Sequence, residues 1–160
     1  MLRETVTAEL PKRYAGLYPF RGDIMPARKP MPVTKTFQQL CDDAKTRIRE
    51  ASPADIDARI TAPDFRGVVI DVREQDEYRA GHIPGALGVG RGVLEYHIAD
   101  LVPDAAQEIV LYCRGGNRSA LAADSLQTMG YENVVSMTGG FRQWDAEERA
   151  QTTDGEPILH

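Results

Sequence analysis

Two uninterrupted apolar runs, "GVVIDV" at 67–72 and "EIVLYC" at 108–113, constrain the fold of this chain more than any other feature. Neither run alternates apolar with polar residues, and this is the pattern of strands buried on both faces of a parallel sheet. The shorter runs "LGV" at 87–89 and "NVVSM" at 133–137 are expected to add strands. Segments with helical spacing separate these runs, so the sequence predicts an α/β fold with a mostly parallel sheet.

Helices before the second long run are indicated by apolar spacing and by capping residues. Ser52 is placed to cap a helix whose first residue is Pro53. "QDEYRA" at 75–80 predicts a short helix that ends at Gly81. A further helix is expected to begin near Thr36, because five residues recur there at helical spacing. These residues, predicted to form a buried face, are Phe37, Leu40, Cys41, Ala44 and Ile48.

A longer helix is predicted after the cysteine loop, beginning near Ser119 in "RSALAADSLQTMG" at 118–130. Gly130 is placed to cap its C-terminus. The segment "FRQWDAEERA" at 141–150 predicts the last helix, in which Phe141 and Trp144 are expected to anchor the core. The apolar face of the longer helix is expected to consist of Leu121, Ala122, Leu126 and Met129.

Length and composition favour one compact domain with a soluble partner. The chain has 160 residues, of which 42% are hydrophobic, and a net charge of −5 without a basic stripe. These values argue against nucleic-acid or membrane binding, and we expect a cytoplasmic protein. Cys41 and Cys113 are far apart and form no CxxC pair, so both are expected to remain free thiols, with Cys41 in the core.

The predicted organisation has four parts. Residues 1–33 contain five prolines and form an extended arm, in which several aromatic residues leave open an embrace of a second subunit as a homodimer. Residues 34–47 form an additional helix, residues 48–150 the main domain and residues 151–160 a tail.

The segment "CRGGNRS" at 113–119 carries the chemistry of the chain. Cys113 ends a predicted strand, and the following helix directs its free N–H groups and positive dipole end toward the loop. Such a site favours the thiolate, which is the nucleophilic form of cysteine. Gly115 and Gly116 allow the backbone to curl into an anion-binding nest, and Arg114 and Arg118 add positive charge. We expect a small anion cradle with a sulfur at its centre.

Four motifs, "VVIDVREQDEY", "GHIPGA", "CRGGNRS" and "TGGFRQW", together resemble the rhodanese family of sulfurtransferases. The resemblance covers roughly residues 48–150. It implies a rhodanese-like three-layer fold with a five-stranded mostly parallel sheet flanked by helices. It also implies that Cys113 accepts sulfane sulfur from thiosulfate or a persulfide donor and passes it on to a thiol or cyanide.

The resemblance also assigns roles to other residues. The residues expected to bind the persulfide and an anionic donor are Arg114, Gly115, Gly116, Asn117, Arg118 and Ser119. Asp71 and Arg73 are expected to support the mouth of the site, either as a structural ion pair or by direct participation. His82 is expected to stabilise a turn rather than to act as a base, and Arg91 to add charge on a loop. We expect no metal and no cofactor. The expected partners are a small sulfur-containing anion and a thiol or a sulfur-acceptor protein.

Two other functions remain open at this point. Related folds use a cysteine-arginine loop in phosphatases and arsenate reductases, but those enzymes place five residues between the cysteine and the arginine. Here only four separate Cys113 from Arg118, and this tighter ring favours a single sulfur atom. A module without catalysis, which docks a protein partner or relays sulfur to it, is the other alternative.

Overall fold

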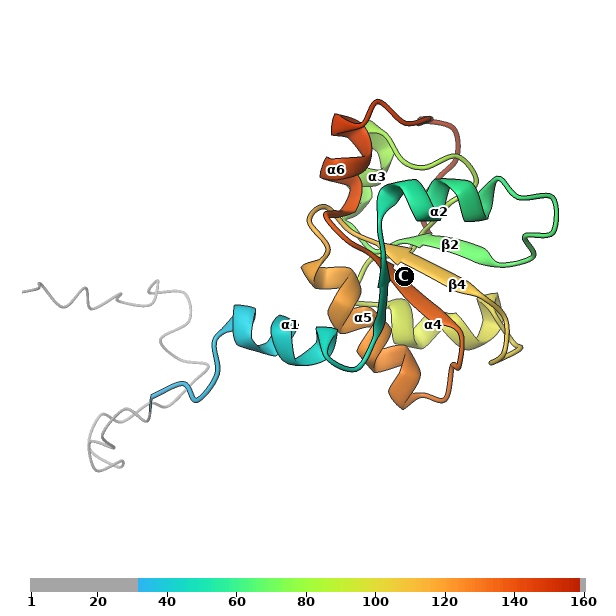
Figure 1. The fold of residues 1–160 in the computed structure, drawn as a ribbon. Coiled ribbons are helices and arrows are strands. Elements are labelled where there is room, and N and C mark those ends of the chain that lie inside the picture. Colours follow the sequence, from blue (N-terminus) through green and yellow to red (C-terminus); the bar gives the residue numbers. More distant parts are fainter. Residues whose placement is uncertain (1–31, 159–160) are drawn as a thin grey trace, which may run out of the picture. The chain divides into compact units, whose positions relative to one another are not determined.

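The computed structural model describes residues 32–158, and five parallel strands form the sheet at the centre of the unit that begins at Lys35 (Figure 1). The strand order is β1-β5-β4-β2-β3. All four pairings are parallel, so the predicted α/β fold is confirmed. The strands are β1 Arg49–Ala51, β2 Val68–Asp71, β3 Leu87–Gly88, β4 Ile109–Tyr112 and β5 Val134–Met137.

Helices cover both faces of this sheet. Ile98 of α4 and Leu126 of α5 pack on one face, in a core that includes Leu111. Ile56 of α2 and Trp144 of α6 pack on the opposite face. The helices are α1 Phe37–Lys45, α2 Pro53–Ile60, α3 Gln75–Ala80, α4 Leu94–Leu101, α5 Asn117–Thr128 and α6 Gly140–Ala146. None of the helices in the described part of the chain is long and apolar enough to span a bilayer.

Local signals account for several boundaries. Ser52 Oγ accepts from the N–H of Asp55 at 3.2 Å, and Pro53 is the first residue of α2, as predicted. The helix α3 ends at Gly81, also as predicted. The segment after α6 is joined to the domain, because His82 and Thr152 exchange two backbone hydrogen bonds of 2.9 Å. The predicted arm over residues 1–33 lies outside the described residues except for its last two positions.

Parts of two predicted apolar faces are exposed. In α1, only Cys41 and Ala44 are buried, whereas Phe37 and Leu40 are 57% and 47% exposed. Among the described elements, α5 is the main packing partner of α1. The domain therefore covers only one narrow side of α1. Met129 is 47% exposed because it is the C-cap of α5, beyond the last turn that the sheet covers. The short strand β1 and the helix α4 were not among the predicted elements.

Candidate active site

Cys113 directly follows β4, at the carboxyl end of the sheet where parallel α/β folds place their sites. Its Sγ accepts a hydrogen bond from the N–H of Gly116 at 3.1 Å, and the residue is only 1% exposed. Gly116 has a φ of +92°, which a side chain at this position would disfavour, and α5 begins at the next residue. The turn therefore places the sulfur at the positive end of a twelve-residue helix.

Two buried hydroxyl groups continue the polar surroundings of the sulfur. Ser119 Oγ lies 3.6 Å from Cys113 Sγ and can also donate to the carbonyl oxygen of Gly116 at 3.2 Å. Ser136 of β5 donates to Ser119 Oγ at 2.9 Å, and both serines are fully buried. Sequence reasoning did not find Ser136. The signal was available, since a lone polar residue interrupts the apolar strand "VVSM" at 134–137.

The start of α6 holds the cysteine loop from the other side. The N–H of Phe141 donates to the carbonyl oxygen of Cys113 at 2.7 Å, and the N–H of Arg142 donates to that of Arg114 at 3.0 Å. Gly140 makes this approach feasible. It has a φ of +59°, and a Cβ at this position would lie 2.3 Å from the Cys113 carbonyl oxygen. The "TGG" turn is thus a structural support of the loop.

Arg118 is held at the side of the site by α3. Its Nη1 and Nη2 donate to the Glu77 carboxylate at 3.0 and 3.2 Å. Burial alone would raise the pKa of Glu77, but the hydrogen bonds from Arg118 and from the Glu74 N–H outweigh burial and lower it. Glu77 was not predicted, and it ties the arginine of the loop to the motif that contains Arg73.

The helix α1 contacts the opposite side of the loop. Lys45 Nζ donates to Asn117 Oδ1 at 2.9 Å, and Asn117 Nδ2 donates to Gln38 Oε1 at 3.2 Å. Cys41 Sγ lies 4.0 Å from the Asn117 carbonyl oxygen. Burial raises the pKa of the Cys41 thiol, which favours its neutral form. Both cysteines are free, so Cys41 is a core residue that supports the first turn of α5.

Asp71 and Arg73 form a buried ion pair at the carboxyl end of β2. Arg73 Nη2 and Asp71 Oδ2 are 2.6 Å apart, and the two residues are 6% and 0% exposed. Arg73 Nη2 also donates to the carbonyl oxygen of Gly81 at 2.6 Å. The Arg73 guanidinium lies 4.1 Å from the centroid of the Phe141 ring. The pair therefore connects three parts of the fold, which are the end of β2, the turn that follows α3, and the helix α6.

His82 and Arg91 interact with groups other than the Cys113 sulfur. The two ring nitrogens of His82 face the carbonyl oxygens of Tyr78 and Asp154 at 2.9 and 3.0 Å, and its ring stacks on that of Tyr78. This arrangement fits the expected role in a turn. Arg91 Nη1 lies 2.7 Å from a carboxylate oxygen of Glu95. Glu95 belongs to the first turn of α4, and Arg91 precedes this helix.

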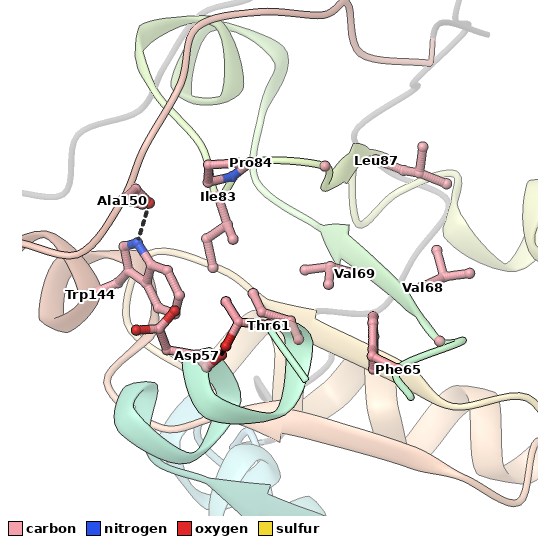
Figure 2. A pocket seen from close by; sticks show the side chains of 13 residues that line it. Asp57, Thr61, Phe65, Val68, Val69, Ile83, Pro84, Leu87, Trp144 and Ala150 are labelled. Carbon is pink, nitrogen blue, oxygen red and sulfur yellow. Dashed lines mark hydrogen bonds between the residues drawn. The ribbon is translucent and has the colours of Figure 1, made fainter. Parts of the chain in front are cut away.

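A separate apolar cavity of about 560 Å³ lies over β2, on the face that α2 and α6 cover (Figure 2). Phe65, Ile83 and Trp144 are among its lining residues, and the indole N–H of Trp144 donates to the carbonyl oxygen of Ala150 at 2.9 Å. No residue of the loop 113–119 lines this cavity. The Cys113 sulfur and this apolar space are thus distinct features of the domain.

Comparisons with known proteins agree with the arrangement of sheet and loop. The chain is 37% identical over 79 residues to the thiosulfate sulfurtransferase GlpE of Pseudoalteromonas translucida, which covers 49% of this chain and 73% of that protein. It is 34% identical over 76 residues to the putative sulfur carrier protein YrkF of Bacillus subtilis, over 48% of this chain and 40% of YrkF.

A solved structure shares most of the described fold. It is a protein of unknown function from Rhodopseudomonas palustris, described as a possible tyrosine phosphatase, with 31% identity and a TM-score of 0.70 over 77% of this chain and 98% of that one. The family model of the rhodanese-like domain matches residues 52–147, which include both ends of the site from Asp71 to Arg142. The chain therefore belongs to the rhodanese-like domain family.

Proposed function

We propose that this protein is a sulfurtransferase that carries sulfane sulfur as a persulfide on Cys113. The observation that carries the proposal is the position of Cys113 Sγ, which accepts the Gly116 N–H at 3.1 Å at the start of α5. The helix end and the buried Ser119 hydroxyl add further donors beside the sulfur. Membership of the rhodanese-like family and the names of the relatives GlpE and YrkF support sulfur transfer as the class of reaction.

The reaction has two displacement steps. The Cys113 thiolate attacks the outer sulfur of thiosulfate, a new S–S bond forms, and the donor S–S bond breaks so that sulfite leaves with the bonding electrons. A thiolate or cyanide then attacks the outer sulfur of the persulfide and restores the Cys113 thiolate. The backbone N–H of Gly116 and the helix end stabilise the anionic sulfur in both steps.

Phosphoryl transfer fits the same loop less well. Only four residues separate Cys113 from Arg118. Both terminal nitrogens of Arg118 donate hydrogen bonds to the Glu77 carboxylate rather than to the sulfur. A phosphatase needs such an arginine to bind the transferred phosphoryl group. We expect negligible hydrolysis of aryl phosphates.

A steady-state assay of thiocyanate formation from thiosulfate and cyanide tests the proposal. Cys113→Ser is expected to reduce the rate to that of the uncatalysed reaction while circular dichroism remains that of a folded protein. Cys41→Ala removes the other thiol and is the matched control, which is expected to retain transfer. Transfer by Cys113→Ser near the original rate would refute the assignment, as would Cys113-dependent hydrolysis of p-nitrophenyl phosphate without any thiocyanate formation.

A further inference from the structure

The side chain of Arg118, in the first turn of α5, is already paired with a carboxylate. Its Nη1 and Nη2 donate to the two carboxylate oxygens of Glu77 at 3.0 and 3.2 Å, and the two side chains are 30% and 22% exposed. The next residue, Ser119, carries the hydroxyl that lies 3.6 Å from Cys113 Sγ. The turn that surrounds the sulfur therefore contains a guanidinium whose charge is neutralised by a residue of α3.

Glu77 is held in this orientation by its own helix. It is the third residue of α3, and its Oε2 accepts the backbone N–H of Glu74 at 3.2 Å as well as Arg118 Nη1. The pKa of Glu77 lies below its ordinary value of 4.5, so the carboxylate is charged at neutral pH. Because α3 fixes the carboxylate, the carboxylate fixes the position of Arg118.

The charge of Arg118 acts on the sulfur through space. Within residues 32–158, Cys113 Sγ is hydrogen-bonded to the Gly116 N–H and the Ser119 hydroxyl, and not to Arg118. Burial would lower the pKa of Arg118, but the hydrogen bonds and charge of Glu77, together with the negative charge of Cys113, raise it. A change in the net charge of the Glu77–Arg118 pair should therefore alter the potential that an anion meets at the sulfur.

The other charges around the site compensate little for this neutrality. Asp71 and Arg73 also form a neutral pair. Arg114 and Arg142 are exposed, so water and salt screen their charges. The Gly116 N–H and the start of α5 supply a partial charge of about half an elementary unit. This partial charge suits one anionic sulfur, and a second negative charge on a donor meets no unpaired buried cation among the described residues.

Donors of sulfane sulfur differ in charge, and this difference is what the pair can select. Thiosulfate is a dianion, whereas an organic persulfide or thiosulfonate carries one negative charge. On the basis of the sulfur transfer proposed above, we propose that Glu77 is a positioning residue that holds Arg118 in a neutral pair and thereby favours singly charged sulfane donors over thiosulfate. Glu77 sets this specificity without touching the donor.

Two donors of similar shape isolate the second charge. Methanethiosulfonate differs from thiosulfate by a methyl group in place of one oxygen and its charge. The Cys113 thiolate attacks the outer sulfur of either donor, a new S–S bond forms, and the donor S–S bond breaks with its electrons on methanesulfinate or sulfite. We measure kcat/KM for each donor as thiocyanate formation with cyanide as the acceptor. The charge ratio, defined as kcat/KM for thiosulfate divided by that for methanethiosulfonate, cancels effects common to both donors.

A cycle of variants separates charge from structure. Glu77→Gln leaves Arg118 uncompensated and is expected to raise the charge ratio about fivefold, and Arg118→Gln is expected to lower it by a similar factor. The double variant lacks both charges, so its charge ratio is expected to return to that of the unaltered protein. Glu156→Gln is the matched control and should leave the charge ratio unchanged, because Glu156 pairs with Arg79 at a largely exposed position.

The possible outcomes distinguish this inference from the proposed function. A merely structural role of Glu77 would lower kcat/KM for both donors alike, and an unchanged charge ratio in Glu77→Gln would overturn the inference. A double variant with a charge ratio as low as that of Arg118→Gln would also overturn it, because Arg118 would then bind thiosulfate despite its pairing. Turnover that depends on Cys113 but shows either result refutes only the role of Glu77. Absence of such turnover with both donors, in a protein that circular dichroism shows to be folded, refutes sulfur transfer and this inference together.

Discussion

Ser136 Oγ donates a 2.9 Å hydrogen bond to Ser119 Oγ, and this contact determines where the Ser119 proton can go. Because Ser119 accepts from Ser136, its own proton is available to Gly116 O or to Cys113 Sγ, 3.6 Å away. The two buried serines therefore form a short hydrogen-bond chain that lies against the Cys113 sulfur.

The first prediction concerns this chain. Ser119→Ala is expected to lower the rate of Cys113 alkylation by iodoacetamide at neutral pH about tenfold, because it removes a hydrogen bond to the thiolate. Ser136→Ala should lower the rate by a smaller factor, since it acts only through Ser119. Ser125→Ala, on the same helix but bound to Glu95, is the control and should leave the rate unchanged. A normal rate in Ser119→Ala would contradict the role given to the chain.

The second prediction concerns the contact between α6 and the cysteine loop. Gly140→Ala is expected to lower the free energy of unfolding by about 3 kcal/mol, because a Cβ would overlap the Cys113 carbonyl oxygen in addition to straining a positive φ. Gly85→Ala is the matched control. It has a φ of +79° but no atom within 4 Å of the new Cβ, so only the backbone cost of about 1 kcal/mol is expected. Equal losses in urea denaturation would show that the contact is unimportant.

The third prediction concerns acid stability. The pKa of Glu77 is lower in the folded protein than its ordinary value of 4.5, so its pairing with Arg118 stabilises the fold above that value. This contribution is lost as the pH falls through the folded pKa. Glu77→Gln should lower the free energy of unfolding at neutral pH by about 1 kcal/mol and make its decline below about pH 5 shallower.

Denaturation curves at several pH values measure this effect. Glu156→Gln is the control, because Glu156 pairs with Arg79 at a largely exposed position and should change stability little. An acid profile of Glu77→Gln that is parallel to that of the unaltered protein would be inconsistent with the lowered pKa.

The fourth prediction concerns the buried pair of Asp71 and Arg73. Arg73→Met should lower the free energy of unfolding by about 3–5 kcal/mol, because it leaves a buried carboxylate without its partner. The double variant Asp71→Asn, Arg73→Met should recover part of this loss, since the uncompensated charge is then absent. Additive losses in the double variant would argue against a coupled ion pair.

The sequence predicted the central strands and the cysteine loop because their signals are local. The apolar runs of β2 and β4 are uninterrupted, and Ser52 with Pro53 is a strong start signal for α2. β1 was not predicted, because it has only three residues and no apolar run. It forms at the edge of the sheet through pairing with β5. The exposure of Phe37 and Leu40 depends on how little of α1 the domain covers, and no local pattern contains this information.

The surroundings of the site were less predictable because they join distant segments. The pairing of Arg118 with Glu77 spans 41 positions in the sequence. The hydrogen bond between Ser136 and Ser119 joins the strand β5 to the helix α5. The hydrogen bond from the Arg142 N–H to the Arg114 carbonyl oxygen likewise needs the α6 turn to bring the two residues together. Spacing in the sequence shows none of these contacts, since each depends on the folded topology.

Intact-protein mass spectrometry after incubation with thiosulfate tests the central claim most directly. The account predicts a gain of the mass of one sulfur atom, which cyanide removes, which Cys41→Ala retains and which Cys113→Ser lacks. A folded protein that gains no sulfur, or that gains it equally in Cys113→Ser, would contradict the claim that Cys113 carries the transferred sulfur.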